Sequence, residues 1–264
     1  MKFTKMHGLG NDYLYVYGEV PENIAEITQK LSERHFGAGS DGIIYISKSD
    51  IADFKMRIFN ADGSEAKMCG NGIRCVGKFV YDKGYTDKKF ISIETLSGVK
   101  YLTLQVAGGK VKTVAVDMGQ AKAEKPINLT VDGETVSLIP VSVGNPHAVI
   151  FVDDIEKAPL TKLGPIIEHH EAFPDGVNVE FVEVLGADKL RIRVWERGSG
   201  VTMACGTGAC ASVMAAIAAK LCHYDETVSV LLDGGTLKIQ IAPDNTVQMT
   251  GPAETIYEGE TEIC

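Results

Sequence analysis

The chain has 264 residues, of which 45% are hydrophobic and 7% aromatic. This size and composition suit a globular protein with two cores of ordinary size and exclude a disordered chain. The formal charge of −9 and the pI near 5.2 argue against a nucleic-acid partner, because no basic stripe is present to neutralise phosphates. The sequence has neither a charge-free apolar run of membrane-spanning length nor a secretory pattern after Met1. We therefore expect a cytoplasmic protein without membrane contact, whose ligand is a small molecule.

Short strands bounded by glycine, asparagine and aspartate turns dominate the first half of the sequence. A surface helix is predicted over Ile24 to Phe36, with Asn23 as its N-cap. A second helix is predicted over Gly70 to Tyr81, and we expect it to have a wetter side because Arg74 and Lys78 interrupt its apolar residues. The strands predicted in this half are Phe3 to Met6, Tyr13 to Tyr17, Ile43 to Ile46, Phe54 to Phe59, Phe90 to Thr95, Tyr101 to Val106 and Val111 to Val116.

The second half repeats this scheme after a polar connector that includes Pro126 to Asp132. A short helical stretch is predicted within Ile155 to Ile167. The helix predicted over Gly206 to Leu221 is apolar on every side, which is typical of a helix that is buried all round. The strands predicted here are Val136 to Val143, Ala148 to Val152, Val177 to Val184, Arg191 to Glu196, Val228 to Leu232, Thr236 to Ile241 and Thr246 to Thr250.

Two copies of the pattern Cys-Gly-x-Gly open the two apolar helices. The cysteines are Cys69 and Cys205, an offset of 205 − 69 = 136 residues. Further pairs match in the same order, so chance similarity is improbable. They are Gly10-Asn11 with Gly144-Asn145, Asp41-Gly42-Ile43 with Asp175-Gly176-Val177, and Arg57-Ile58-Phe59-Asn60 with Arg193-Val194-Trp195-Glu196.

The duplication predicts two homologous, pseudo-symmetric domains of the α+β class. Each domain is expected to be a mostly antiparallel or mixed β-sheet wrapped around a central buried helix. We place the first domain at residues 1–117 and the second at 118–251, and the C-terminal strand, at about 252–264, can return to pack on the first domain. The two helix starts, and with them Cys69 and Cys205, are expected to meet at a shared cleft.

A cysteine at the start of a helix is where a thiol is most easily made a thiolate, because the helix dipole is positive there. One thiolate and one thiol facing each other across a carbon atom would form a base and an acid that invert that centre. Backbone N–H groups of the two first turns suit a carboxylate and would stabilise the negative charge that develops as the proton leaves. No electron-sink cofactor is then required.

The six cysteines are better explained as reduced thiols than as disulfides or a metal site. The chain is large, and it lacks a Cys-x-x-Cys knuckle. We expect no metal. Outside the Cys-Gly-x-Gly pair, the cysteines are expected to be small buried residues or incidental thiols, namely Cys75, Cys210, Cys222 and Cys264.

Motifs across nearly the whole sequence resemble those of the diaminopimelate epimerase family. They are Met6-His7-Gly8-Leu9-Gly10-Asn11-Asp12, Phe59-Asn60-Ala61-Asp62-Gly63-Ser64-Glu65, Met68-Cys69-Gly70-Asn71-Gly72, Gly144-Asn145-Pro146-His147, Glu196-Arg197-Gly198 and Ala204-Cys205-Gly206-Thr207-Gly208. The resemblance implies a cofactor-independent enzyme that interconverts LL- and meso-diaminopimelate, in the synthesis of lysine and peptidoglycan precursors. It also suggests a homodimer.

The resemblance implies roles for individual residues. Cys69 and Cys205 would be the acid/base pair and exchange roles with the direction of reaction. His147 and Glu196 would tune the acidity of the thiols. The substrate would contact Asn11, Asn60, Gly70, Asn71, Asn145, Asn178, Glu196, Arg197, Gly206 and Thr207. One departure is Gly42, where some family members carry a substrate-contacting glutamine.

Three alternatives remain open on the sequence. Proline and hydroxyproline racemases also use two cysteines, but their first motif resembles Cys-Gly-His-Gly, whereas Asn71 stands here. Relatives of the phenazine-pathway isomerase type resemble the fold without the paired thiols, and the two cysteines of this chain speak against that type. A third alternative is a thiol-redox or amino-acid-binding protein in which Cys69 and Cys205 would close a regulatory disulfide without catalysis.

Overall fold

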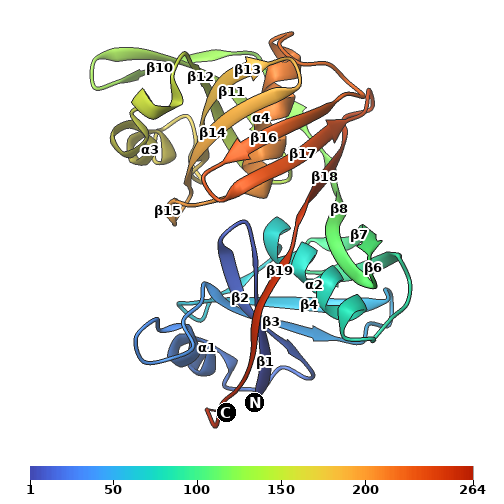
Figure 1. The fold of residues 1–264 in the computed structure, drawn as a ribbon. Coiled ribbons are helices and arrows are strands. Elements are labelled where there is room, and N and C mark those ends of the chain that lie inside the picture. The colour runs from blue at the N-terminus through green and yellow to red at the C-terminus, as the bar shows by residue number, and fades with distance from the viewer. Residues whose placement is uncertain (264) are drawn as a thin grey trace. The chain divides into compact units, whose positions relative to one another are not determined.

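A computed structural model describes residues 1–263, and these form two compact units. Unit 1 comprises Met1–Val116 and Gly251–Cys264, and unit 2 comprises Asp117–Thr250. Each unit contains a mixed β-sheet and two α-helices (Figure 1).

The helices are α1 (Ile24–Ser32), α2 (Gly70–Asp82), α3 (Leu160–Glu168) and α4 (Gly206–Ala218), with a 3-10 turn, η1, at Ile155–Lys157. The strands before residue 122 are β1 (Lys2–Gly8), β2 (Asn11–Tyr17), β3 (Gly42–Ser47), β4 (Phe54–Asn60), β5 (Glu65–Ala66), β6 (Phe90–Thr95), β7 (Gly98–Ala107) and β8 (Lys110–Gln120). The later strands are β9 (Lys122–Ala123), β10 (Ile127–Val131), β11 (Glu134–Ser142), β12 (Pro146–Val152), β13 (Asn178–Gly186), β14 (Lys189–Glu196), β15 (Gly200–Val201), β16 (Thr227–Leu232), β17 (Gly235–Ile241), β18 (Thr246–Pro252) and β19 (Glu254–Glu260).

The two units share one strand topology. In unit 1, β2 pairs with β3 and β4 pairs with β6 in parallel, while the pairs β1–β2, β3–β4 and β6–β7 are antiparallel. In unit 2, the same order recurs, with β12–β13 and β14–β16 parallel and β11–β12, β13–β14 and β16–β17 antiparallel. A helix lies within each parallel crossover, as parallel strands require a long connection. The mixed sheets and the repeated topology confirm the predicted α+β duplication.

The C-terminal strand β19 lies beside β1, so the two ends of the chain meet in one sheet (Figure 1). Strand β9 takes the corresponding place beside β11 in unit 2. Along the chain, β19 comes directly after β18, and β9 comes directly after β8. The prediction for the C-terminal segment names residues up to 264, and residue 264 lies outside the described residues.

Helix α4 is buried on every side, as its sequence predicts. It packs against strands β9, β11, β12, β13, β14, β16 and β17. Its residues from Gly208 to Ile217 are all buried, because small alanine and glycine side chains allow the surrounding strands to approach. Smaller apolar clusters lie under α1 in unit 1 and under α3 in unit 2.

The predicted wetter side of α2 is wrong. Arg74 is fully buried and Lys78 is 8% exposed. The Arg74 guanidinium donates to the carbonyl oxygens of Gly70 and Pro252, both at 3.1 Å. The Lys78 ammonium lies 2.8 Å from the Val111 carbonyl oxygen. Backbone carbonyls accept from both cations, and Asp82 Oδ2 pairs with Lys78 at 2.8 Å, which allows both to be buried.

Three local predictions also differ from the structure. The expected connector at Pro126 to Asp132 contains strand β10, because Leu129 and Val131 alternate with polar residues and are buried against β11. Helix α1 ends at Ser32 rather than near Phe36, which is 91% exposed and contributes nothing to a buried face. Asn23 precedes α1 but its side chain makes no cap hydrogen bond.

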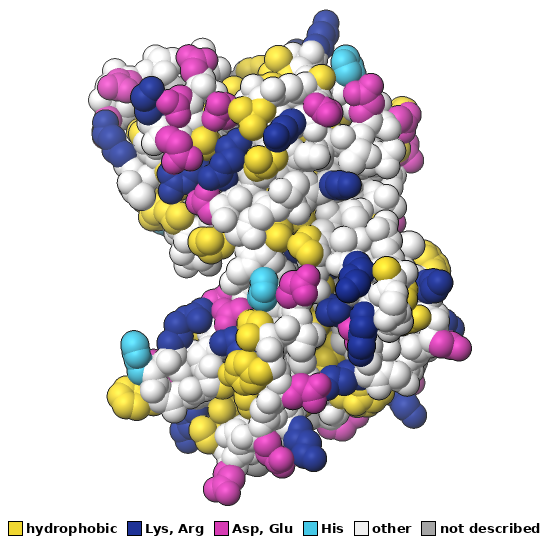
Figure 2. Space-filling model, viewed as in Figure 1, with side chains coloured by type: hydrophobic (Ala, Val, Ile, Leu, Met, Phe, Trp, Pro, Cys, Tyr) yellow, Lys and Arg dark blue, Asp and Glu magenta, His cyan; other side chains and the backbone are white. Residues whose placement is uncertain are grey.

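Both signs of charge are present on the face drawn in Figure 2. Figure 2 shows Asp and Glu side chains interspersed with Lys and Arg over the visible face of each unit. No helix within residues 1–263 is long and apolar enough to cross a membrane. In the same residues, no group of three or more His, Cys, Asp or Glu side chains is arranged to hold a metal ion.

Candidate active site

Both cysteines of the repeated pattern are N-cap residues. Cys69 precedes α2 and Cys205 precedes α4, each with an extended backbone. Each sulfur accepts a hydrogen bond from the backbone N–H of the second glycine of its pattern, Gly72 or Gly208, at 3.3 Å. A thiol here takes the place that serine or aspartate usually fills, and it satisfies an N–H that the helix itself leaves without a partner.

In unit 1, Cys69 lies beside Asn11. The thiol donates to the side-chain oxygen of Asn11, with Sγ 3.2 Å from Oδ1. The side-chain nitrogen of Asn11 donates to Asp41 Oδ2 at 2.8 Å. Gly10 has a φ of 88°, which glycine adopts without strain, and this turn brings the start of β2 to the thiol.

The remaining unit 1 candidates make local contacts of their own. The side-chain oxygen of Asn71, in the first turn of α2, accepts from the buried Arg74 guanidinium at 3.0 Å. Asn60, at the end of β4, donates from its side chain to the Ser64 hydroxyl at 3.1 Å. The backbone N–H groups of the first turn of α2 begin at Gly70, the residue after the cap.

A chain of polar groups surrounds Cys205 in unit 2. The hydroxyl of Thr207 lies 3.5 Å from Cys205 Sγ and 3.4 Å from the side-chain nitrogen of Asn145. The side-chain oxygen of Asn145 lies 3.1 Å from His147 Nε2. His147 Nδ1 in turn lies 2.7 Å from Glu180 Oε1, and both side chains are fully buried.

Glu180 is a site residue that the sequence analysis missed. It lies in β13, between β12 and β14. A Cβ atom placed on Gly208 would be 2.7 Å from Glu180 Oε1 and 3.3 Å from Cys205 Sγ, so the carboxylate and the thiol pack on the same glycine. The second carboxylate oxygen, Oε2, is buried and has no hydrogen-bond partner within residues 1–263. The available signal was weak, because a glutamate between Val179 and Phe181 fits a solvent-facing position of a strand equally well.

The pKa of the Cys205 thiol is raised well above its usual value. Burial is the largest cause, followed by the negative charges of Glu196 and Glu180. Hydrogen bonds from Thr207 and from the Gly208 backbone act in the opposite direction but are outweighed. The expectation that the helix start makes this thiol acidic is therefore wrong for Cys205, which is held as the neutral thiol.

Glu196 is coupled to the same thiol. Its carboxylate hydrogen-bonds the Thr202 hydroxyl and the Cys205 thiol. Burial, and then the charge of Glu180, raise its pKa, while both hydrogen bonds and His147 lower it. Two weakly acidic groups joined by a hydrogen bond can share one proton.

Asn178 and Arg197 form the outer part of the unit 2 site. Asn178 donates to the Pro146 carbonyl at 3.0 Å and accepts from the Arg197 backbone N–H at 3.0 Å, so both ends of its amide are engaged. The exposed Arg197 guanidinium donates to the Asp175 carbonyl at 2.8 Å. Asn178 thus fixes the backbone from which Arg197 projects.

Gly42 cannot carry the glutamine found in some family members on this backbone. Its φ is +152°, and a Cβ there would lie 2.0 Å from the Phe59 carbonyl oxygen. Any substrate contact at this position comes from the backbone or from another residue.

The chain matches the sequence profile of diaminopimelate epimerase over residues 3–124 and 139–256. The chain belongs to the diaminopimelate epimerase family. A diaminopimelate epimerase of Methanococcus maripaludis is 52% identical over 279 residues and covers 100% of both chains. One from Acetivibrio thermocellus is 50% identical over 279 residues, covering 100% of this chain and 99% of that protein.

Solved structures outside the diaminopimelate epimerase family share the fold. A phenazine biosynthesis protein of Bacillus anthracis aligns with a TM-score of 0.79 at 16% identity, covering 100% of this chain and 99% of that one. A probable proline racemase of Agrobacterium radiobacter aligns with a TM-score of 0.74 at 16% identity, covering 100% and 93%. At this level of identity, the likeness concerns the fold alone.

Proposed function

We propose that this protein epimerises one α-carbon of diaminopimelate, interconverting the LL and meso isomers without a cofactor. The observation that carries the proposal is the pair of cysteines that cap α2 and α4 in a member of this family. Each thiol accepts from the N–H of its own helix at 3.3 Å, and each helix start offers further backbone donors.

The proposed reaction moves one proton off the α-carbon and one proton on. The thiolate of one cysteine takes the α-proton and becomes a thiol. The thiol of the other cysteine gives its proton to the opposite face of the same carbon and becomes a thiolate. No atoms are gained or lost, and the stereochemistry of that carbon is inverted. In the reverse direction Cys69 and Cys205 exchange roles.

Removal of the α-proton is difficult because that proton is far less acidic than a thiol. The charge that develops spreads onto the α-carboxylate. We assign the stabilisation of this charge to the first turns of α2 and α4, through Gly70, Asn71, Gly206 and Thr207, since backbone N–H groups at a helix start favour an anion. These donors act on the transition state more strongly than on the substrate.

The second stereocentre must be recognised without reacting. Arg197 is suited to a carboxylate of the substrate, because its planar guanidinium can bind both oxygens. Asn178 holds the Arg197 backbone, and the side chains of Asn11, Asn60 and Asn145 are further candidate partners for the amino and carboxylate groups. We propose ten residues in all as substrate contacts. They are Asn11, Asn60, Gly70, Asn71, Asn145, Asn178, Glu196, Arg197, Gly206 and Thr207.

The environment of Cys205 favours the neutral thiol before substrate binds, and one of the two sulfurs must lose its proton before it can act as the base. Burial, Glu196 and Glu180 raise its pKa, so the sulfur carries a proton near neutral pH. We assign the tuning of this thiol's acidity to Glu196 and His147. Glu196 hydrogen-bonds the thiol, and His147 is linked to it through Asn145 and Thr207.

We further propose that the enzyme acts in the cytoplasm, in the synthesis of lysine and peptidoglycan precursors, and that it forms a homodimer. The mechanism needs two reduced thiols, which a reducing compartment maintains. Sedimentation of the purified protein measures the assembly directly.

Purified protein under reducing conditions tests the proposal. Incubated with LL-diaminopimelate and no cofactor, it should form the meso isomer, measured by chiral chromatography, while L-proline and trans-4-hydroxy-L-proline should remain unchanged. Failure to form the meso isomer, or faster turnover of either proline, would overturn the assignment.

A further inference from the structure

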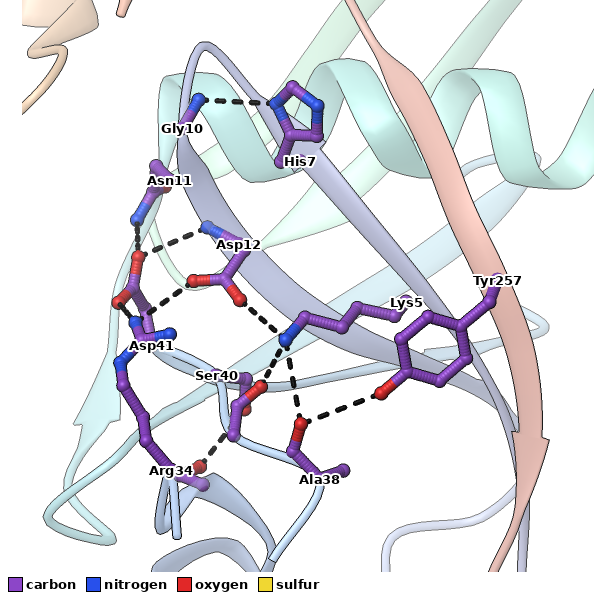
Figure 3. A network of polar contacts seen from close by, with 12 residues as sticks. Lys5, His7, Gly10, Asn11, Asp12, Arg34, Ala38, Ser40, Asp41 and Tyr257 are labelled. Atoms are coloured by element: carbon purple, nitrogen blue, oxygen red, sulfur yellow. Dashed lines mark hydrogen bonds and ion pairs between the residues drawn. The ribbon is translucent and has the colours of Figure 1, made fainter.

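The Asn11 side chain is held between a carboxylate and the Cys69 thiol. Its nitrogen lies 2.8 Å from Asp41 Oδ2, and its oxygen lies 3.2 Å from Cys69 Sγ. Figure 3 shows Asn11 directed at Asp41 from the start of β2. An ionised carboxylate only accepts hydrogen bonds, so the end of the amide that faces Asp41 must be the NH₂ group. The carbonyl oxygen is therefore the end that faces the sulfur.

Asp41 is itself held in place by several donors. Its Oδ2 accepts from the Asp12 backbone N–H at 3.0 Å, and its Oδ1 accepts from Arg34 at 2.8 Å. The Asp41 backbone N–H donates to the Asp12 carbonyl at 2.7 Å. Lys5 and Arg34 both pair with the buried Asp12 carboxylate, at 2.9 and 3.1 Å, which completes the network in Figure 3. These donors fix the orientation of the Asp41 carboxylate.

The direction of the Asn11 amide decides which form of the thiol it favours. A carbonyl oxygen accepts from S–H and stabilises the thiol, whereas an N–H group would donate to the sulfur and stabilise the thiolate. We propose that Asp41 is a positioning residue that holds the Asn11 carbonyl against Cys69 and so favours the protonated form of this sulfur. A rotation of the amide by 180° would reverse the effect, and the Asp41 carboxylate prevents it.

The matching asparagine of unit 2 has the opposite arrangement. The Asn145 oxygen faces His147 Nε2 at 3.1 Å, and its nitrogen faces the Thr207 hydroxyl at 3.4 Å, which in turn lies 3.5 Å from Cys205 Sγ. Asp175, which matches Asp41 in sequence, uses its backbone carbonyl to accept from Arg197. In unit 1 the amide oxygen of the asparagine therefore faces the thiol, whereas in unit 2 the amide nitrogen faces the hydroxyl that contacts the thiol.

The inference rests on the proposed role of Cys69 as an acid/base thiol, but its test does not require turnover. The protein is treated with iodoacetamide at a series of pH values, denatured, digested with trypsin and analysed by mass spectrometry. Cleavage after Lys67 and Arg74 yields Met68–Arg74, a peptide in which Cys69 is the single cysteine. The midpoint of its alkylation against pH reports the ionisation of Cys69 alone. A failed epimerase assay would leave this measurement intact, so the two proposals fail separately.

Asp41→Ala should move the midpoint for Cys69 to lower pH by about one unit, because the acceptor that holds the Asn11 NH₂ group is gone and Asn11 can turn its N–H towards the sulfur. Arg34→Gln is the matched control, since it weakens the same ion-pair network but leaves the contact between Asp41 and Asn11. It should leave the midpoint unchanged.

The double variant separates orientation from simple charge. In an Asn11→Ala background, Asp41→Ala should have little effect on the midpoint, because the amide through which Asp41 acts is gone. An equal shift in that background, or no shift in a folded Asp41→Ala protein, would overturn the proposal. If Asp41→Ala does not fold, Asp41→Leu is measured in its place against the same expectations.

Discussion

At the scale of single residues, opposing effects meet at Cys205. The cap hydrogen bond from Gly208 and the Thr207 hydroxyl favour the thiolate, while burial and two carboxylates favour the thiol. The protonated thiol is favoured, because the free-energy penalty of a negative charge in the low-dielectric interior exceeds the stabilisation that two hydrogen bonds give the thiolate. Glu180 is one of these carboxylates, and its side chain hydrogen-bonds His147.

Replacement of Glu180 by Gln should lower the pKa of Cys205, because it removes a negative charge that raises this pKa. Iodoacetamide alkylates the thiolate, so a lower pKa moves the onset of Cys205 alkylation to lower pH, by about half a unit or more. The peptide Gly198–Lys220 reports this, with fragment ions separating Cys205 from the buried Cys210. Glu183→Gln, on the same strand, is the control and should show no shift. An unchanged onset in Glu180→Gln would contradict the role assigned to Glu180.

The cysteines of the site and some of their neighbours, among them Asn11 and Glu196, could be named from the sequence, whereas Glu180 and the role of Asp41 could not. The repeated Cys-Gly-x-Gly pattern singles out Cys69 and Cys205, because glycines next to a helix start have a clear physical meaning. Glu180 alternates with apolar residues in its strand, so it reads as a solvent-facing position until the neighbouring strands are known. Asp41 reads as a turn residue, and its contact with Asn11 depends on packing between β2 and the segment before β3.

At the scale of elements, each thiol has a structural role as well as the proposed chemical one. Serine is a good N-cap and alanine is a poor one. Cys69→Ser should therefore keep nearly the full free energy of unfolding, whereas Cys69→Ala should lose about 1 kcal/mol, measured by urea denaturation. Both should lose epimerase activity by about a thousand-fold, because neither side chain can act as the acid or base. Equal stability of the two variants would show that the cap hydrogen bond contributes nothing.

The register of β3 and β4 depends on Gly42, which pairs with Asn60. Gly42→Gln should destabilise the protein by about 2 kcal/mol or more, since its Cβ would overlap the Phe59 carbonyl and its φ of +152° disfavours a side chain. Gly84→Ala is the control, with a φ of +77° but open space around the Cβ, and should cost about 1 kcal/mol. Chemical denaturation of both variants measures the difference. A Gly42→Gln protein as stable as the wild type would contradict this packing.

Secondary structure could be predicted where side chains alternate over five or more residues. The strand at Phe90–Thr95 has the predicted bounds, whereas the two-residue strands β5, β9 and β15 carry no pattern to detect. The burial of Arg74 could not be foreseen, because the carbonyl of Pro252 that accepts from it is 178 residues away in the sequence. Tertiary hydrogen bonds of this kind override the usual preference of a charged residue for solvent.

At the scale of the whole molecule, duplication has given two units with one topology and two different thiol environments. Cys69 is half-buried beside Asn11 and Asp41, while Cys205 is buried beside Glu196 and the His147–Glu180 pair. Such a difference suits a substrate whose two faces are chemically distinct. It follows that the central claim, one thiol acting on each face of one carbon, can be tested by following the origin of the proton in the product.

The most direct measurement is the deuterium content of the product formed from LL-diaminopimelate in D₂O, extrapolated to zero conversion. Two thiols on opposite faces predict that the first meso product carries one solvent deuterium at its inverted carbon, while the recovered LL substrate carries none. A first product that retains protium at that carbon, with solvent label appearing in the recovered substrate, would indicate a single base acting on both faces and would contradict the account.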